Sequence, residues 1–153
     1  MVIGEFETKI TEKRRTAIPK KFRDEIGTGL IITRGYEKSL VIVNQEMWNR
    51  IAAPIINGSF INRNIRETSR LIVGGAYEIE LDSVGRFVIP SNLAEYAELE
   101  EEIMIVGLVN WIEIWKKNNW IKKMENLQEK GDEIAQELIN ANRTETGKLD
   151  ARK

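Results

Sequence analysis

Three consecutive basic side chains, Lys13, Arg14 and Arg15, stand in the stretch ITEKRRTAIP at residues 10–19. An arginine can donate two hydrogen bonds to O6 and N7 of a guanine, whereas lysines and further arginines neutralise phosphates. We therefore assign Arg15 to base edges in a DNA groove. The phosphate contacts are assigned to its neighbours Lys9, Lys13 and Arg14. The alternative is a solvated strand edge whose charges prevent pairing with strands of other chains.

A second stretch, LDSVGRFVIP at residues 81–90, has the same outline with a single arginine, Arg86. Asp82 precedes this arginine by four residues, across a turn at Gly85, and could neutralise it. Two interpretations of Arg86 therefore stay open. It is either a second DNA contact or one half of a structural salt bridge.

Three carboxylates occupy alternate positions before this turn, at Glu78, Glu80 and Asp82. On a strand they would share one face, as a catalytic carboxylate pair requires, but any half-exposed strand has the same pattern. The sequence has no histidine, no cysteine and no Gly-rich phosphate loop. We therefore expect no enzyme, no cofactor, no bound metal and no small-molecule ligand.

Charge is unevenly distributed along the chain, although the formal net charge is only −1. Residues 9–23 contain seven bases and one acid, whereas residues 76–113 contain nine acids and one base. A localised basic patch suits a polyanion even when the net charge is near zero. Arg23 belongs to this patch and could reach a phosphate, although a solvated helix charge is the commoner case.

Length and composition indicate a globular protein, with 153 residues, 42% of them hydrophobic and 31% charged. No apolar run approaches the roughly 18 residues that span a bilayer, so we expect no membrane association. The N-terminal residues lack the basic and apolar regions of a signal peptide. We expect a cytoplasmic protein, associated with the nucleoid if the basic patch binds DNA.

Alternating apolar positions and turn residues predict the elements of the first half. Strands are expected at 6–10 and 15–18, and a short helix from Pro19 to residue 26. Asn44 is expected to cap a helix that carries Trp48 in the core. The remaining expectations are a strand, loop and strand over 30–43 and a helix over 61–73 with inward-facing Ile61, Ile65, Leu71 and Ile72.

The second half repeats this plan, which indicates an internal duplication. At an offset of 71 residues, Arg15 matches Arg86 and Pro19 matches Pro90. At an offset of 72, Gly35 matches Gly107 and Trp48 matches Trp120, so we expect both tryptophans to be core anchors. Units of about 50 residues rarely fold alone, so the repeats should pack on each other with interleaved strands as an internal pseudo-dimer.

The residues around both turns resemble the frame D-x-K-G-R-hydrophobic-x-Ile/Val-P of AbrB/SpoVT-like swapped-hairpin domains. Two copies in one chain, the segment NRNIRETSR between them and the downstream VGLVNWIEIWKKNNW are similar to the MraZ family of bacterial regulators. The resemblance covers residues 3–124. It implies an α+β fold, mainly β, with two such repeats, connecting helices and a C-terminal helix.

The expected parts are repeat 1 at 3–52, a linking helical segment at 53–75, repeat 2 at 76–120, and a C-terminal helix with a frayed tail at 121–153. The resemblance also implies a ring-like homo-oligomer. Members are transcriptional regulators, usually repressors, that bind short G-rich direct repeats in double-stranded DNA upstream of their own cell-division and cell-wall operon. They do so through the hairpin arginine, which corresponds to Arg15 and Arg86 here.

This chain departs from the family frame at three positions. Thr11 replaces the first aspartate, Arg14 replaces the first turn glycine, and Ala94 stands where the second copy should match Arg23. Thr11 leaves Arg15 without its local carboxylate, and Arg14 lacks the freedom of glycine at positive φ.

Two other functions stay open beside the DNA-binding one. One is a ring-forming protein-interaction module whose basic tip meets an acidic protein surface. The other is an antitoxin-like member of the AbrB superfamily, against which the second full repeat argues. The linking helix carries three arginines on one face, Arg63, Arg66 and Arg70. They could line a DNA-facing surface, but we expect them to pair with the acidic second half of this or a neighbouring subunit.

Overall fold

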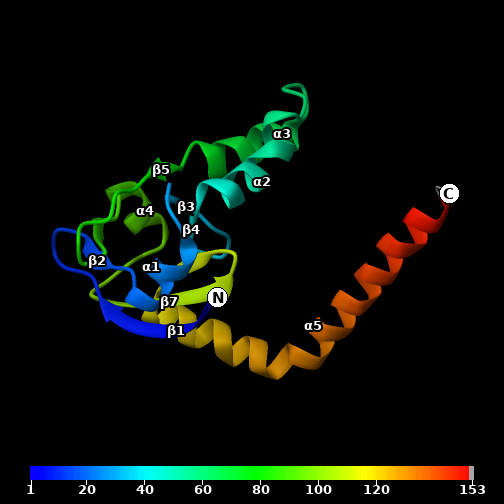
Figure 1. Cartoon of the computed structure of the whole chain (residues 1–153). Helices are drawn as coiled ribbons and strands as arrows, with labels where there is room; N and C mark the ends of the chain where they lie inside the picture. Colours follow the sequence, from blue (N-terminus) through cyan, green and yellow to red (C-terminus); the bar gives the residue numbers. More distant parts are fainter. Residues whose placement is uncertain (152–153) are drawn as a thin grey trace. The chain divides into compact units, whose positions relative to one another are not determined.

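The computed structural model describes residues 1–151, with side chains through residue 147 (Figure 1). It divides into two compact units, residues 1–117 and the part of the last helix that begins at residue 118. The strands are β1 (Val2–Lys9), β2 (Arg15–Ala17), β3 (Ile31–Arg34), β4 (Leu40–Val43), β5 (Tyr77–Glu78), β6 (Arg86–Val88), β7 (Glu102–Val109) and β8 (Ile112–Lys116). The helices are α1 (Lys20–Ile26), α2 (Gln45–Ile56), α3 (Arg63–Thr68), the π-helical turn η1 (Ser69–Val73), α4 (Ser91–Tyr96) and α5 (Lys117–Ala151).

The main sheet has six strands in the order β1-β7-β8-β4-β3-β5, and every pair is antiparallel. The order is the same from either end once the repeats are matched, because β1 corresponds to β5, β7 to β3 and β8 to β4. The central pairing of β4 with β8 joins Val41 to Glu113, with Leu40 opposite Ile114 on one side. A pseudo-two-fold axis therefore passes between the two repeats at this point.

The first strand of each repeat is exchanged onto the other repeat. β1 pairs with β7 along eight residues, from Val2 opposite Val109 to Lys9 opposite Glu102. In the same way, β5 of the second repeat pairs with β3 of the first. This exchange confirms the predicted α+β fold, mainly β, in which two repeats form one internal pseudo-dimer.

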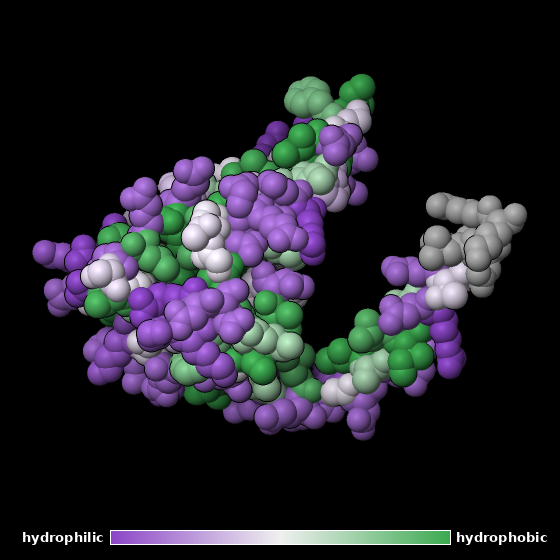
Figure 2. Space-filling model, in the orientation of Figure 1, coloured by the Kyte–Doolittle hydropathy of each residue, from purple (hydrophilic) through white to green (hydrophobic). Residues whose placement is uncertain are grey.

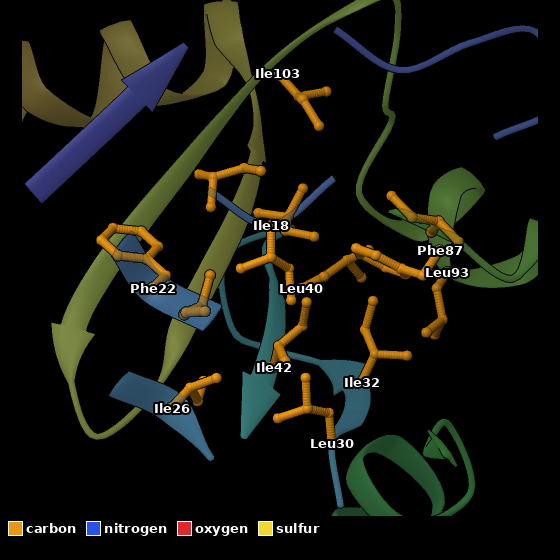
Figure 3. Packing of buried hydrophobic residues seen from close by; sticks show 14 of the residues in the cluster. Ile18, Phe22, Ile26, Leu30, Ile32, Leu40, Ile42, Phe87, Leu93 and Ile103 are labelled. Carbon is orange, nitrogen blue, oxygen red and sulfur yellow. The ribbon is translucent and has the colours of Figure 1, made fainter. Parts of the chain in front are cut away.

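The hydrophobic core lies between the sheet and the two short helices α1 and α4 (Figure 3). Phe22 on α1 and Leu93 on α4 occupy matching places in the two repeats, and both are fully buried. Their neighbours on the sheet include Ile32, Leu40 and Ile42, which are also fully buried. Residues of both repeats therefore build one shared core, as expected for halves too small to fold alone.

Several local predictions are confirmed and others are wrong. Asn44 caps α2, since its side-chain oxygen accepts the N–H of Met47 at 2.8 Å. Trp48 and Trp120 are only half-buried, and the buried tryptophan is Trp115, at 4% exposure. Ile61, predicted to face inward, is 84% exposed because it precedes α3, in the loop at the tip of the arm formed by α2 and α3.

The second unit is a single helical stretch, the part of α5 from residue 118. The helix extends to Ala151, across most of the stretch for which the sequence predicts a frayed tail; residues 152 and 153 lie outside the described part. Ile134 and Leu138 are exposed on this helix. None of the described helices is both long and apolar enough to cross a membrane.

Candidate nucleic-acid interface

The two turns that carry the candidate arginines have the same backbone hydrogen bonds. In the first turn, the N–H of Arg14 donates to the carbonyl of Thr11 at 2.9 Å. The N–H of Thr11 then donates to the carbonyl of Arg15 at 3.0 Å. The second turn repeats both bonds at the offset of 71 residues. The N–H of Gly85 donates to the carbonyl of Asp82, and the N–H of Asp82 donates to the carbonyl of Arg86. The duplication therefore extends to the geometry of both turns.

Both turns place one residue in the left-handed region of the backbone. Arg14 has a φ of 58° and Gly85 a φ of 81°. Glycine adopts this conformation without a steric penalty, whereas a residue with a Cβ does so at a cost. With Arg14 in place of glycine, the first turn thus keeps the backbone hydrogen bonds and the left-handed residue of the second turn.

The strands that follow the turns pair with each other and form a separate two-stranded ribbon. In this ribbon β2 and β6 are antiparallel, with Thr16 opposite Phe87 at the centre. The sequence alone suggests a hairpin formed by two strands of one repeat. The ribbon is not such a hairpin, because each repeat contributes one of its two strands. Two further backbone hydrogen bonds join the repeats at the ends of the ribbon. The N–H of Ile89 donates to the carbonyl of Arg14, and the N–H of Ile18 donates to the carbonyl of Gly85.

The two faces of the ribbon differ in burial. Thr16 and Phe87 point inward, each at 4% exposure. Successive side chains of a strand point to opposite faces, so Arg15 and Arg86 share the outer face. Both are exposed, and Val88 lies opposite Arg15 in the register. The structure therefore brings the two predicted DNA-contacting arginines together on one surface.

The space in front of this face is a surface pocket of about 470 Å³ lined by residues of both turns. Its lining contains three cationic side chains and one carboxylate. The lining residues are Thr11, Glu12, Lys13, Arg15 and Arg86. The surface in front of the ribbon is therefore predominantly positive.

Asp82 organises the second turn. Its carboxylate accepts the N–H groups of Val84 at 3.0 Å and Arg86 at 2.9 Å, and also the Nε–H of Arg86 at 2.8 Å. The hydrogen bond from the Arg86 backbone is the largest cause that lowers the pKa of Asp82 to about 2. The structure therefore contains the salt bridge, made through Nε of Arg86, and no described residue accepts a hydrogen bond from its Nη atoms. A DNA contact of Arg86 through these Nη atoms stays a prediction.

The first turn keeps only half of this arrangement. The hydroxyl of Thr11 accepts the N–H of Arg15 at 3.1 Å, which replaces the backbone contact made by Asp82. A hydroxyl supplies no negative charge, and no described carboxylate forms an ion pair with Arg15. Thr11 thus preserves the turn and leaves the Arg15 guanidinium free of an intramolecular salt bridge.

The remaining predicted contacts differ in how they are held. Lys9 forms an ion pair with Glu101 at 3.7 Å, and both side chains are exposed. Exposed pairs of this kind contribute little, so the assignment of Lys9 to a phosphate stays a prediction. Lys13 lines the pocket. Arg14 donates from Nε to the carbonyl of Ile89 at 3.0 Å. Arg23 on α1 is half-buried, and its guanidinium packs beside the second turn.

The arginines of the linking helices have local partners. Arg66 donates to the carbonyls of Phe60 and Ile61 at 3.0 and 2.8 Å. Arg70 forms an ion pair with Glu67 at 3.5 Å. Arg66 and Arg70 therefore do not pair with the acidic second half of the same described chain, and pairing with a neighbouring subunit stays a prediction.

The carboxylate pattern considered for catalysis does not form a site. The strand β5 is only two residues long, so Glu78, Glu80 and Asp82 do not share a strand face, and all three are exposed. Among the described residues, no cluster of three histidine, cysteine, aspartate or glutamate side chains is placed to hold a metal ion.

Comparison with known proteins agrees with this geometry. The family model described as "MraZ protein, putative antitoxin-like" matches twice, at residues 1–71 and 72–142. Transcriptional regulator MraZ of Syntrophomonas wolfei is 35% identical over 92% of this chain and 98% of its own length. The proteins of the same name from Halothermothrix orenii and Caldicellulosiruptor bescii are 37% and 36% identical, over 88% and 90% of this chain and 94% and 96% of their own lengths. The chain, with its two exchanged repeats, therefore belongs to the MraZ family.

Proposed function

We propose that this protein is a transcriptional regulator that binds double-stranded DNA with the outer face of the β2–β6 ribbon. The observation that carries the proposal is the placement of Arg15 and Arg86 together on that exposed face. A two-stranded ribbon is narrow enough to enter the major groove, where arginine can donate two hydrogen bonds to guanine. The names of the relatives support the regulatory role.

The contacts divide by chemistry. Arg15 is assigned to a guanine edge because no described carboxylate neutralises it. Arg86 is held by Asp82 through Nε and presents its two Nη atoms, so it is assigned to a second base edge. Lys13 is assigned to a phosphate, since a lysine neutralises charge without reading sequence.

The targets follow from the family resemblance and the ribbon together. Arginine as the reading residue favours guanine, so we propose short G-rich direct repeats upstream of the protein's own cell-division and cell-wall operon as the binding sites. Because the family resemblance implies regulators that are usually repressors, we propose the role of repressor. The protein would act in the cytoplasm, on the nucleoid.

Direct repeats call for several ribbons in one assembly, and we propose a ring-like homo-oligomer. The arm formed by α2 and α3 offers an apolar surface for a second copy of the chain. Ile56, Phe60 and Ile61 are all exposed at its end, where hydrophobic residues gather on the surface (Figure 2). Exposed apolar patches of this kind mark association surfaces.

The test is fluorescence-anisotropy binding to the protein's own upstream DNA and to a shuffled duplex over a salt series. The wild type should prefer the native DNA, and Arg15→Ala should lose this preference while it stays folded. Equal, weak binding of both duplexes that Arg15→Ala leaves unchanged would contradict the proposal. That outcome would favour a protein-interaction module, whose basic pocket would bind an acidic protein surface.

A further inference from the structure

The second turn has no side chain at its left-handed position, and an arginine from helix α1 occupies the space. A Cβ on Gly85 would lie 2.4 Å from Cδ and 2.7 Å from Cζ of Arg23. Gly85 is itself buried, and Nε of Arg23 is buried without a hydrogen-bond partner. Glycine is therefore favoured here by its φ of 81°, and a Cβ at this position would also displace the Arg23 side chain.

The first turn is built in the reverse way. Its left-handed position carries the long side chain of Arg14, which lies against the other repeat and donates from Nε to the carbonyl of Ile89. The offset of 71 residues places Ala94, on α4, where the second turn has Arg23. The first turn thus combines a large turn residue, Arg14, with a small helix residue, Ala94. The second turn combines glycine in the turn with the large Arg23 on the helix.

This reciprocity explains two of the departures from the family frame together. The pseudo-two-fold axis relates Gly85 and Arg23 to Arg14 and Ala94. An arginine at both positions of one pair would compete for the same space beside the turn. Each turn therefore keeps one guanidinium, which comes from helix α1 in one case and from the turn itself in the other.

We propose that Arg14 and Arg23 are pseudo-equivalent phosphate clamps, one at each turn of the ribbon. This inference rests on the proposed DNA-binding function. Neither arginine forms an ion pair with a described carboxylate, so each brings an uncompensated positive charge to its turn. Arg14 directly precedes Arg15, and Arg23 packs at Gly85, which directly precedes Arg86. Packing and a carbonyl contact fix the two side chains, so they hold the register of the ribbon on the backbone without reading the sequence.

The test gives the first turn the residues of the second, glycine in the turn and arginine on the helix, and measures the salt dependence of DNA binding. Arg14→Gly alone and Arg23→Ala alone should each lower the salt slope of binding to a random duplex by about 0.9 for every ribbon engaged. Both variants should keep the preference for the native DNA. The double variant Arg14→Gly/Ala94→Arg should recover the slope and affinity of the wild type to within about twofold, because it rebuilds the second turn's arrangement at the first.

The outcomes separate this inference from the function on which it rests. A double variant that binds like Arg14→Gly, or single variants with an unchanged slope, would overturn the inference. Arg15→Ala is measured alongside: if it retains the native preference, the proposed function itself fails. If it loses the preference while the double variant is not rescued, only the clamp assignment fails.

If the double variant Arg14→Gly/Ala94→Arg does not fold, a variant of the second turn tests the same inference. Gly85→Ala places a Cβ in the space of Arg23 and should displace that guanidinium. We expect Gly85→Ala to lower the slope as much as Arg23→Ala, and the combination of both to lower it no further. Additive losses in the combination would show that Gly85 acts independently of Arg23 and would overturn the inference.

Discussion

Replacement of Thr11 by aspartate tests whether the free charge of Arg15 faces DNA. The two turns share their backbone geometry, so an aspartate at 11 should accept the N–H and Nε–H of Arg15 as Asp82 does for Arg86, at 2.9 and 2.8 Å. The charge of the outer face then falls by one unit for each ribbon, while the turn is preserved.

The size of the effect follows from counterion release. One neutralised contact lowers the slope of log K against log salt by about 0.9. If both proteins extrapolate to the same affinity at 1 M salt, Thr11→Asp should bind a random duplex about eightfold more weakly at 0.1 M, for each ribbon engaged. Fluorescence anisotropy over a salt series measures both quantities.

Thr11→Asn is the matched control. An asparagine accepts the same backbone N–H groups at nearly the same size but adds no negative charge. We expect its salt slope to equal that of the wild type. Equal slopes for Thr11→Asp and Thr11→Asn would refute the reasoning, because the Arg15 guanidinium would then lie away from the DNA.

Three further predictions concern the ribbon's support and the assembly. Phe87→Ala should reduce the free energy of unfolding in urea by about 3–5 kcal/mol, whereas Val88→Ala on the outer face should change it by less than about 0.5 kcal/mol. Similar losses for the two variants would show that the inner and outer faces of the ribbon are misassigned. Because the folded pKa of Asp82 is lowered from 3.8 to about 2, its stabilising contribution should be complete above pH 3.8 and lost as the pH falls to about 2. Asp82→Asn should remove this pH-dependent part, and NMR titration of an unshifted carboxyl would contradict it. Phe60→Ser with Ile61→Ser should lower the oligomer mass in light scattering while Tyr36→Ser does not, and an unchanged mass would argue against the arm as an association surface.

The duplication explains why so much of the fold could be predicted from the sequence. Matching positions such as Ile18 with Ile89 and Phe22 with Leu93 require the same core environment twice, and all four are buried. Two repeats that share one core imply an internal two-fold, which the order of the sheet confirms.

The pairing of the ribbon could not be predicted in the same way. Alternation in residues 15–17 shows which side chains share a face, but it contains no information about the partner strand. The turn bonds of Thr11 bring β2 back toward β1 as in a hairpin, whereas the ladder of β2 is made with β6 of the other repeat. The partner is decided by the exchange of strands between repeats, which is a long-range property.

One wrong prediction and one contact that was not predicted have a related cause. A helical period places Ile61 with Ile65 and Ile72 on one face, yet α3 begins only at Arg63 and Ile61 lies in the exposed loop before it. The contact between Arg23 and Gly85 joins residues of different repeats, so neither residue's neighbours in the sequence indicate it. The local signals gave the correct residue types but not their tertiary partners.

The most direct test of the DNA-binding ribbon is site-directed cross-linking from its outer face. The chain has no cysteine, so Ala17→Cys introduces a single thiol opposite Arg86, to which a photoactivatable cross-linker can be attached. Ala53→Cys, exposed on α2, is the control position. We expect strong cross-linking from position 17 to the native upstream duplex, removed by unlabelled native DNA but not by shuffled DNA, and little from position 53. Equal cross-linking from both positions, or none from position 17 in a protein that still binds the duplex, would contradict the account.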